Sequence, residues 1–389
     1  MLDFNNTEVA FKSKSNADLN RAFVLFKTIS SPAVVSIAKV MTQVALSARI
    51  PVGWAVKPTL YKQFVGGESI EKCQPVVQQL GEHKVKSILD YSVEGTDKPE
   101  AMQQALDETI RSIKHAGSQE YIPFAVFKPT AFGDSMMLQK ASEEALMSER
   151  DEKLKEEFFH RIDILCKTAF EEQVPILIDA EDYAYQNQID KVVDAMMEKY
   201  NQKQAIVFNT LQMYRVDRLQ MLKTAVQRAR DKEYYYGVKF VRGAYMEKER
   251  ERAERMGYPD PVQPSKEATD RDYNAALQFS VENLDIVTVF NGTHNEYSSK
   301  YLTQLMEEYQ IAKDDPRVWF SQLYGMSDHI SFNLAEAGYN VAKYVPYGPV
   351  KHVLPYLLRR AEENTSVKGQ SGRELSLISQ ERKRRKQSH

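Results

Sequence analysis

Cysteine is scarce in this chain: its 389 residues include only Cys73 and Cys166. Two cysteines exclude a disulfide framework and a cysteine-based metal site, and they favour a reducing compartment. Cys166 lies in the apolar run 162–170 and is interpreted as a small buried hydrophobe. An excess of charge is also lacking, because the formal net charge is −2. No nucleic acid partner is therefore expected.

Long apolar stretches are missing as well. No run reaches about 18 apolar residues, so no transmembrane helix is expected. The N-terminus carries acidic residues and has no basic stretch followed by an apolar one, so no signal peptide is predicted. The expected location is the cytoplasm, with a peripheral contact at the inner face of a membrane. The basic segment 381–389 can supply that contact, although most such tails are disordered solubilising ends.

Several catalytic signatures are absent. There is no Gly-x-Ser-x-Gly motif, and neither cysteine ends a predicted strand, so a covalent hydrolase is not expected. His294 has no partner histidine at a metal-ligand spacing, and no metal is predicted. The other histidines considered are His83, His115, His160, His329 and His352.

The first 83 residues are predicted to form an N-terminal helical arm. One helix is expected over 16–29, with Asn16 as its N-cap. A second is expected from Ser31 to Arg49, with a proline near its first turn, and a third over 69–80. No strand-like alternation occurs in this region.

Eight short apolar runs follow, rich in β-branched and aromatic residues. They are 85–93, 122–128, 175–181, 205–212, 237–243, 285–292, 317–325 and 341–348. Helical patterns separate them, at 101–116, 153–173, 188–200, 216–232, 270–283, 298–309 and 327–338. This alternation predicts an α/β fold of the (β/α)8, TIM-like type, in a distorted form, over residues 84–366. Residues 367–389 are expected to be a flexible basic tail. A doubly wound sheet is the alternative, but no Gly-x-Gly-x-x-Gly follows the first strand.

Polar residues occur at the C-terminal end of every predicted strand. They are Asp90, Glu94, Lys128, Asp179, Glu181, Gln212, Arg242, Tyr245, Thr293, His294, Asn295, Gln322 and Tyr344. In a (β/α)8 barrel the C-terminal ends of the strands build the active site. Lys128 and Asp179 lie on neighbouring strands, where they form either a site or a structural salt bridge.

Two further segments carry candidate binding groups. In the turn 240–245, Gly243 and Ala244 lack bulk and Arg242 could meet a phosphate, although an ordinary strand-to-helix turn gives the same pattern. A charged insertion, 246–264, follows it. The helix predicted over 349–364 has an apolar stripe, and its other face can bind a small carboxylate or be solvated. The stripe consists of Val353, Leu354, Leu357, Leu358 and Ala361, and the other face of Tyr356, Arg359, Arg360 and Glu363.

The chain resembles the monofunctional, FAD-dependent proline dehydrogenase family. The resemblance rests on Val-Lys-Phe-Val-Arg-Gly-Ala-Tyr at 238–245 and Tyr-Leu-Leu-Arg-Arg-Ala-Glu-Glu-Asn at 356–364. Segments 178–181, 293–295 and 320–326, with Gln212 and Tyr344, support it over roughly residues 85–366. It implies a flavoenzyme that oxidises L-proline to 1-pyrroline-5-carboxylate, the first step of proline catabolism. Hydride would pass from C5 of proline to N5 of FAD, and electrons then to a membrane quinone.

The resemblance also implies residue roles. Asp179, Gln212 and Lys239 would surround the flavin ring, and lysine replaces the arginine that some members have at position 239. The rest of FAD would be held by Arg242, Gly243, Ala244, Tyr245, Ser265, Lys266, Thr293, His294, Asn295 and Gln322. Lys128, Asp179 and Tyr344 would be catalytic. The residues implied for proline binding are Lys128, Tyr344, Arg359, Arg360, Glu363 and Glu94.

Other functions remain open from sequence. The alternatives are a hydroxyproline dehydrogenase of the same family, an aldolase-type enzyme with Lys128 as a Schiff base, and a non-catalytic sensor of proline or flavin. Tyr344 leaves little room beside the substrate ring, which favours proline over hydroxyproline.

Overall fold

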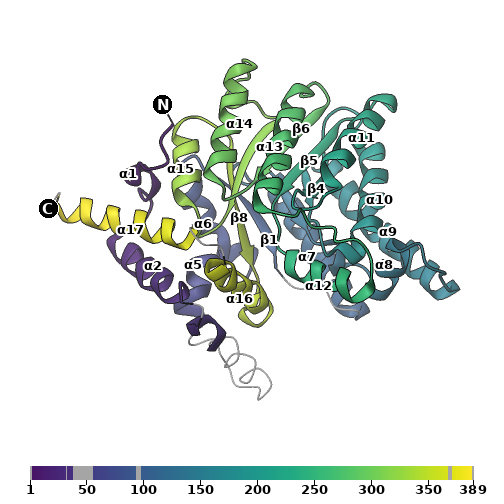
Figure 1. Cartoon of the computed structure of the whole chain (residues 1–389), viewed down its shortest axis with the longest axis horizontal. Helices are drawn as coiled ribbons and strands as arrows, with labels where there is room; N and C mark the ends of the chain where they lie inside the picture. The colour runs from purple at the N-terminus through teal and green to yellow at the C-terminus, as the bar shows by residue number, and fades with distance from the viewer. Residues whose placement is uncertain (1, 32, 38–55, 93–97, 367–369, 388–389) are drawn as a thin grey trace. The chain divides into compact units, whose positions relative to one another are not determined.

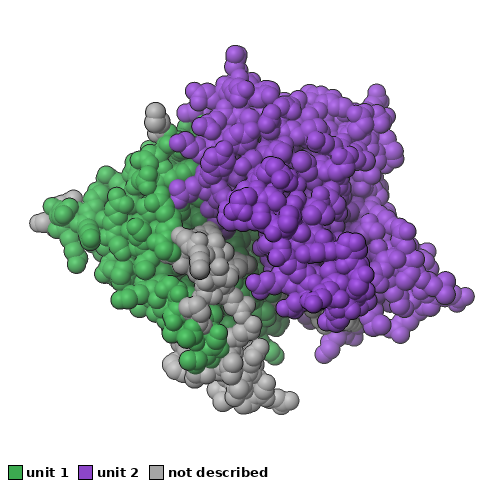
Figure 2. Space-filling model, viewed as in Figure 1, with its two compact units in different colours: residues 1–93, 322–389 green, residues 94–321 purple. Residues whose placement is uncertain are grey.

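A computed structural model describes residues 2–31, 33–37, 56–92, 98–366 and 370–387 of the chain (Figure 1). Within α16 and α17 the side chains of residues 362–366 and 370–371 are also outside the description. The chain divides into two compact units, coloured separately in Figure 2. Unit 1 comprises residues 1–93 and 322–389, and unit 2 comprises residues 94–321. The predicted division into arm, barrel and tail remains a prediction.

Each of the eight predicted strands is present. They are β1 Lys86–Tyr91, β2 Ala125–Phe127, β3 Ile176–Ile178, β4 Val207–Gln212, β5 Tyr236–Val241, β6 Val287–Gly292, β7 Val318–Leu323 and β8 Val341–Tyr347. Their order in the sheet is β1-β8-β7-β6-β5-β4-β3-β2, and the pairs with a defined register run parallel. The predicted (β/α)8 fold is confirmed.

The helices of unit 2 lie between its strands in sequence. They are α7 Pro99–Gly117, η2 Pro129–Ala131, α8 Ser135–Ser142, α9 Glu149–Glu171, α10 Tyr183–Tyr200, α11 Arg218–Asp231, α12 Met246–Met256, α13 Lys266–Glu282 and α14 Glu296–Glu308. Three of them, η2, α8 and α12, were not predicted. The insertion 246–264 hid α12 because the buried residues of that helix are Glu249 and Ala253, which form no apolar stripe.

The strands of unit 2 pack around an aromatic cluster. Phe124 makes edge contacts with Phe208, Phe290 and Trp319, with ring centroids 5.1–5.7 Å apart. Because side chains alternate along a strand, Gln212 lies on the same face of β4 as Phe208. Lys239 of β5 is in register with Phe290, so it lies on this inner face too. The cluster therefore supports the layer that carries the polar strand ends.

Unit 1 contains the N-terminal helices and the last part of the chain. Its helices are α1 Thr7–Ala10, α2 Asn16–Ile29, η1 Lys57–Tyr61, α5 Lys62–Phe64, α6 Ile70–Gly81, α15 Asp328–Glu336, α16 Val350–Ser366 and α17 Gln370–Gln387. The predicted helix 16–29 is confirmed, but its N-cap is Ser15 rather than Asn16. Ser15 forms a capping box with Asp18, which satisfies the first backbone N–H groups. The helix predicted over 69–80 is α6, with Ser69 as its cap. Of the helix predicted over 31–49, residues 33–37 are helical and 38–49 lie outside the described residues.

The expected flexible tail is instead largely helical. Leu377 and Ile378 of α17 are buried in one apolar cluster with Leu19 and Phe26 of α2. These two helices contact each other, and they lie side by side in yellow and purple in Figure 1. Arg385 also donates hydrogen bonds to the backbone oxygens of Phe11 and Lys14. Sequence periodicity did not reveal this helix, since arginine contacts to a distant segment hold much of it.

The apolar stripe predicted for the helix after β8 is confirmed in α16. Val353, Leu354, Leu357 and Ala361 are buried, and Leu358 is half-buried. As for membrane insertion, every helix in the described ranges is too short or too polar to span a bilayer.

Candidate active site

Unit 2 brings three charged side chains together at the ends of its strands. Asp179 follows β3, Lys128 follows β2, and Lys239 lies within β5. Oδ2 of Asp179 is 3.6 Å from Nζ of Lys128, and Oδ1 forms an ion pair with Lys239. Lys239 is buried, with 4% of its surface exposed, whereas Lys128 and Asp179 are half-buried. The predicted proximity of Lys128 and Asp179 is confirmed, and one carboxylate holds two cations.

A buried amide stands beside this triad. Nε2 of Gln212, at the end of β4, donates a 2.8 Å hydrogen bond to the backbone oxygen of Glu181. Oε1 of Gln212 is buried and has no hydrogen-bond partner among the residues that the structure describes. A buried acceptor without a donor is unfavourable, so this oxygen suits a ligand N–H group.

Glu181 was noted at a strand end but was not predicted as a site residue. The structure buries it, and its carboxylate accepts hydrogen bonds from the hydroxyls of Thr130 at 2.7 Å and Tyr245 at 3.4 Å. Burial raises the pKa of Glu181, while the hydrogen bond from Thr130 and the charge of Lys128 oppose that rise. Its position in the segment 178–181 was the sequence signal for this residue.

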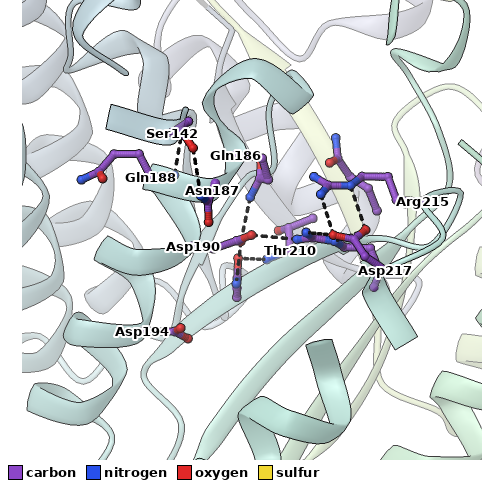
Figure 3. A network of polar contacts seen from close by, with 12 residues as sticks. Ser142, Gln186, Asn187, Gln188, Asp190, Asp194, Thr210, Arg215 and Asp217 are labelled. Carbon is purple, nitrogen blue, oxygen red and sulfur yellow. Dashed lines mark hydrogen bonds and ion pairs between the residues drawn. The ribbon is translucent and has the colours of Figure 1, made fainter. Parts of the chain in front are cut away.

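A buried polar network that includes Gln186 and Asp190 holds the backbone at Glu181 in place. Figure 3 shows Gln186 and Asp190. The backbone N–H of Glu181 donates to Oε1 of Gln186 at 2.7 Å, and Nε2 of Gln186 donates to Asp190 at 2.9 Å. Asp190 in α10 also accepts from Arg218 at 2.7 Å and from Asn209 at 3.1 Å. Because a fully bonded buried network is rigid, it holds the backbone to which Gln212 binds.

The guanidinium of Arg242, just after β5, is fixed on several sides. It donates to Asp270 at 2.7 and 3.0 Å, to Thr293 at 2.7 Å and to Ser298 at 2.8 Å. It also lies 3.9 Å from the centroid of the Tyr273 ring. Sequence reasoning missed Asp270. Burial tends to raise the pKa of Asp270, but hydrogen bonds from Lys266 and Arg242 outweigh it and hold that pKa below its usual value.

The turn after β5 exposes its backbone, yet it leaves no space for a side chain at Gly243. Gly243 and Ala244 are exposed, so their backbone is open to a ligand. A methyl group at Gly243 would collide with Met246 and would lie 2.9 Å from Cδ1 of Tyr214. Glycine at this position is therefore explained by close packing.

Three predicted cofactor residues have local structural roles. Ser265 caps α13 by accepting from the N–H of Ala268, and Asn295 caps α14 by accepting from the N–H of Ser298. Lys266 forms an ion pair with Asp270. Thr293 accepts from Arg242, and His294 is half-buried beside it in sequence. The starts of two helices therefore adjoin residues already engaged with Arg242, and such helix N-termini favour anions.

The remaining predicted residues, apart from Glu94, belong to unit 1. Oε1 of Gln322 in β7 accepts a 2.6 Å hydrogen bond from Ser331, and Tyr344 in β8 is buried. On α16, Arg359 and Arg360 are half-buried, and the guanidinium of Arg360 lies 5.1 Å from the Tyr356 ring centroid. Glu94 and the side chain of Glu363 lie outside the described residues.

The sequence of a known family matches most of the chain. A family model described as proline dehydrogenase matches residues 73–373. The chain belongs to the proline dehydrogenase family. The predicted enzyme class, an oxidoreductase that carries out the first step of proline catabolism, is confirmed by this membership.

Individual relatives agree with the family match. The chain is 35% identical over 322 residues to carbapenem antibiotics biosynthesis protein CarD of Pectobacterium carotovorum subsp. carotovorum, covering 83% of each. It is 31% identical over 428 residues to mitochondrial proline dehydrogenase 1 of Dictyostelium discoideum, covering 98% of this chain and 74% of that protein. Proline utilization A (PutA) from Bdellovibrio bacteriovorus, inactivated by N-propargylglycine, has a similar fold, with a TM-score of 0.72 at 20% identity. That match covers 94% of this chain and 37% of the solved structure.

Proline dehydrogenases of this family depend on FAD, and the residues of unit 2 suit that group. Oε1 of Gln212, which has no hydrogen-bond partner within the described ranges, can accept from a flavin ring N–H. The exposed turn at Gly243 and Ala244 leaves its backbone open to a large ligand. Arg242 and Lys266, which both pair with Asp270, carry positive charge that could meet phosphates. The donor and acceptor set therefore fits the cofactor.

Proposed function

We propose that this proline dehydrogenase oxidises L-proline to 1-pyrroline-5-carboxylate with FAD, and that a membrane quinone then takes the electrons. The arrangement that carries this proposal is Asp179 held between Lys128 and Lys239, beside the open acceptor of Gln212. Bound FAD supplies the hydride acceptor for C5 of proline. The protein supplies orientation and electrostatics around it.

Unit 2 is assigned the cofactor. Asp179, Gln212 and Lys239 border the flavin ring, while the turn around Gly243 and the groups near Arg242 hold the remainder. The ion pair with Asp179 supports this role for Lys239, because it fixes the position of the ammonium group. The other residues of this cofactor set are Ala244, Tyr245, Ser265, Lys266, Thr293, His294, Asn295 and Gln322.

The substrate is assigned to Lys128, Tyr344 and the arginines of α16. Two guanidinium groups suit the proline carboxylate through bidentate contacts, and the Tyr344 ring suits the pyrrolidine ring. The Lys128 ammonium, near the substrate nitrogen, favours the neutral amine, from which hydride loss is easier. Glu363 is assigned to orient the arginines and Glu94 to pair with one of them.

The flavin spectrum tests this function directly. Purified protein should be yellow, or become yellow on addition of FAD, and its flavin absorbance should bleach with L-proline under anaerobic conditions. A colourless protein that takes up no FAD would overturn the proposal. Borohydride trapping of a carbonyl substrate on Lys128 would instead support the Schiff-base alternative.

The quinone requires a membrane contact, which we assign to α17. Lys383 and Lys386 are exposed, whereas Arg384 and Arg385 bind Glu381. Exposed lysines attract anionic lipid. In a liposome-pelleting assay, the double change Lys383→Glu and Lys386→Glu should reduce binding to anionic vesicles. Lys203→Glu, at an exposed site in unit 2, is the control. Equal pelleting of all three proteins would exclude α17 as the contact.

A further inference from the structure

Helix α12 turns a carboxylate inward directly after the proposed cofactor turn. Glu249 is fully buried, with 0% of its surface exposed, and Ala253 is the other buried residue of this helix. Of the other charged residues of α12, Arg252 is half-buried and the rest are exposed. A buried acid is unfavourable unless it is bonded, so its presence in place of an apolar residue calls for a physical reason.

Glu249 ties α12 to two other loops of unit 2. Its Oε1 accepts a hydrogen bond from the hydroxyl of Tyr214 at 2.9 Å and from the backbone N–H of Tyr183 at 3.0 Å. Tyr214 comes soon after β4, and Tyr183 begins α10 after β3. Its Oε2 is buried and has no hydrogen-bond partner in the described part of the chain. One carboxyl group thus joins the segments that follow three consecutive strands.

Tyr214 connects this carboxyl group to the turn. Its ring is fully buried, and Cδ1 lies 2.9 Å from the position of a methyl group added at Gly243. Met246, the first residue of α12, closes the same side of Gly243. The hydroxyl of Tyr214 is held by Glu249 while its ring supports the backbone of Gly243. A change at Glu249 is therefore transmitted to the turn through one rigid side chain.

We propose that Glu249 is a positioning residue whose neutral form holds the turn 242–245 in its ligand-binding shape. As the carboxyl group ionises, the affinity of this turn for FAD falls. This inference rests on the proposed function, in which the turn binds FAD. Glu249 itself acts through Tyr214 and α12 and needs no contact with the cofactor.

The charged neighbours of Glu249 are paired with other groups. Arg215 is buried, but two of its guanidinium nitrogens donate to Asp217 (Figure 3), and Nη1 has no hydrogen-bond partner within the described ranges. Asp182, which would repel an ionised Glu249, forms a 2.6 Å ion pair with Lys248. The hydroxyl of Tyr214 and the N–H of Tyr183 are the groups bonded to the carboxyl itself.

Burial raises the pKa of Glu249 from 4.5 to about 7, although the bonds from Tyr214 and Tyr183 and the charge of Arg215 oppose the rise. A pKa above the unfolded value means that the docked helix binds the proton more tightly than the released helix. The docking of α12 is therefore strongest at low pH, weakens as the pH rises from 4.5 to about 7, and stays weak above that.

The test is FAD affinity of the apoprotein, followed by quenching of flavin fluorescence at about pH 6, 7 and 8. We expect the wild-type Kd to be about tenfold higher at about pH 8 than at about pH 6, because one pKa unit of linkage corresponds to about a factor of ten. Glu249→Gln keeps a neutral acceptor for Tyr214 and Tyr183, so its Kd should not change with pH. Glu247→Gln, an exposed acid of the same helix, should follow the wild type. Wild-type pH dependence retained in Glu249→Gln would overturn the inference.

Two further measurements guard against a folding defect. Trypsin can cut α12 at Lys248, Arg250, Arg252 or Arg255. Relative to Glu249→Gln, nicking of the apoprotein should increase with pH in both the wild type and Glu247→Gln. Tyr214→Phe keeps the ring but removes the hydroxyl that Glu249 holds, so its Kd should change less with pH than the wild-type Kd. Nicking that does not depend on Glu249 overturns the role of Glu249, and an unchanged Tyr214→Phe profile overturns the route through Tyr214. Failure of the wild type to bind FAD at any pH overturns the proposed function instead, and the trypsin result still tests the helix.

Discussion

Lys239 in β5 forms an ion pair with Asp179, which follows β3, so the contact spans the intervening strand β4. Lys239 is buried, so the ion pair with this carboxylate offsets part of the cost of burying its charge. Asp179 also meets Lys128 on its second oxygen, at 3.6 Å. Asp179 thus links Lys239, a buried cation within β5, to Lys128, a half-buried cation that follows β2. Removing the shared carboxylate should affect both.

Asp179→Asn should destabilise the protein and weaken FAD binding. The change leaves Lys239 buried without its counter-charge, which typically costs about 3–5 kcal/mol. Thermal unfolding and an FAD titration measure the two effects. Glu144→Gln, which breaks the exposed pair with Lys191, is the control and should change stability by less than about 1 kcal/mol. Equal unfolding temperatures for the two variants would show that Lys239 does not depend on Asp179.

Lys128→Met should lower turnover and move its pH profile upward. Without the ammonium group the bound amine of proline keeps its proton to higher pH, so activity requires more alkaline conditions. Turnover at neutral pH should fall about tenfold for each unit by which the amine pKa rises. The pH dependence of kcat measures this, with Lys191→Met, in the exposed pair with Glu144, as the control. An unchanged rate and profile would remove Lys128 from the mechanism.

Arg359→Met should weaken the binding of proline through its carboxylate. A hydrogen bond to a charged group contributes about 1.5–3 kcal/mol, which corresponds to a rise of about 10–100-fold in KM. Pyrrolidine lacks the carboxylate, so its KM should change little. Lys351→Met, at an exposed position of the same helix, is the control. A parallel rise for proline and pyrrolidine would mean that Arg359 shapes the helix instead of binding the carboxylate.

The strands were predictable because each is a short apolar run whose signal is local. The strand ends followed from that order, as did the proximity of Lys128 and Asp179. Contacts between distant segments were not predictable in this way. Asp270 binds Arg242 from a helix 28 residues further along, and no pattern in the sequence joins the two. Likewise Glu249 has the sequence context of a solvated, highly charged helix, yet Tyr214 and Tyr183 bury it. Hydrogen bonds between distant segments, which sequence periodicity does not report, determine the surroundings of these two residues.

Tyr344→Ser should improve the use of hydroxyproline relative to proline. Lys343, the preceding residue of β8, forms a 2.9 Å ion pair with Asp328 of α15, so alternation places Tyr344 on the opposite face of the strand. If Tyr344 packs against the substrate ring there, a serine leaves room for a ring hydroxyl. The ratio of kcat/KM for the two substrates should change by about tenfold. Tyr344→Phe keeps the bulk and should retain the preference for proline, which separates ring volume from the phenol hydroxyl. Because Tyr344 is buried, thermal unfolding of both variants is needed to exclude a general loss of structure. An unchanged ratio in a folded Tyr344→Ser protein would place another residue beside the substrate ring.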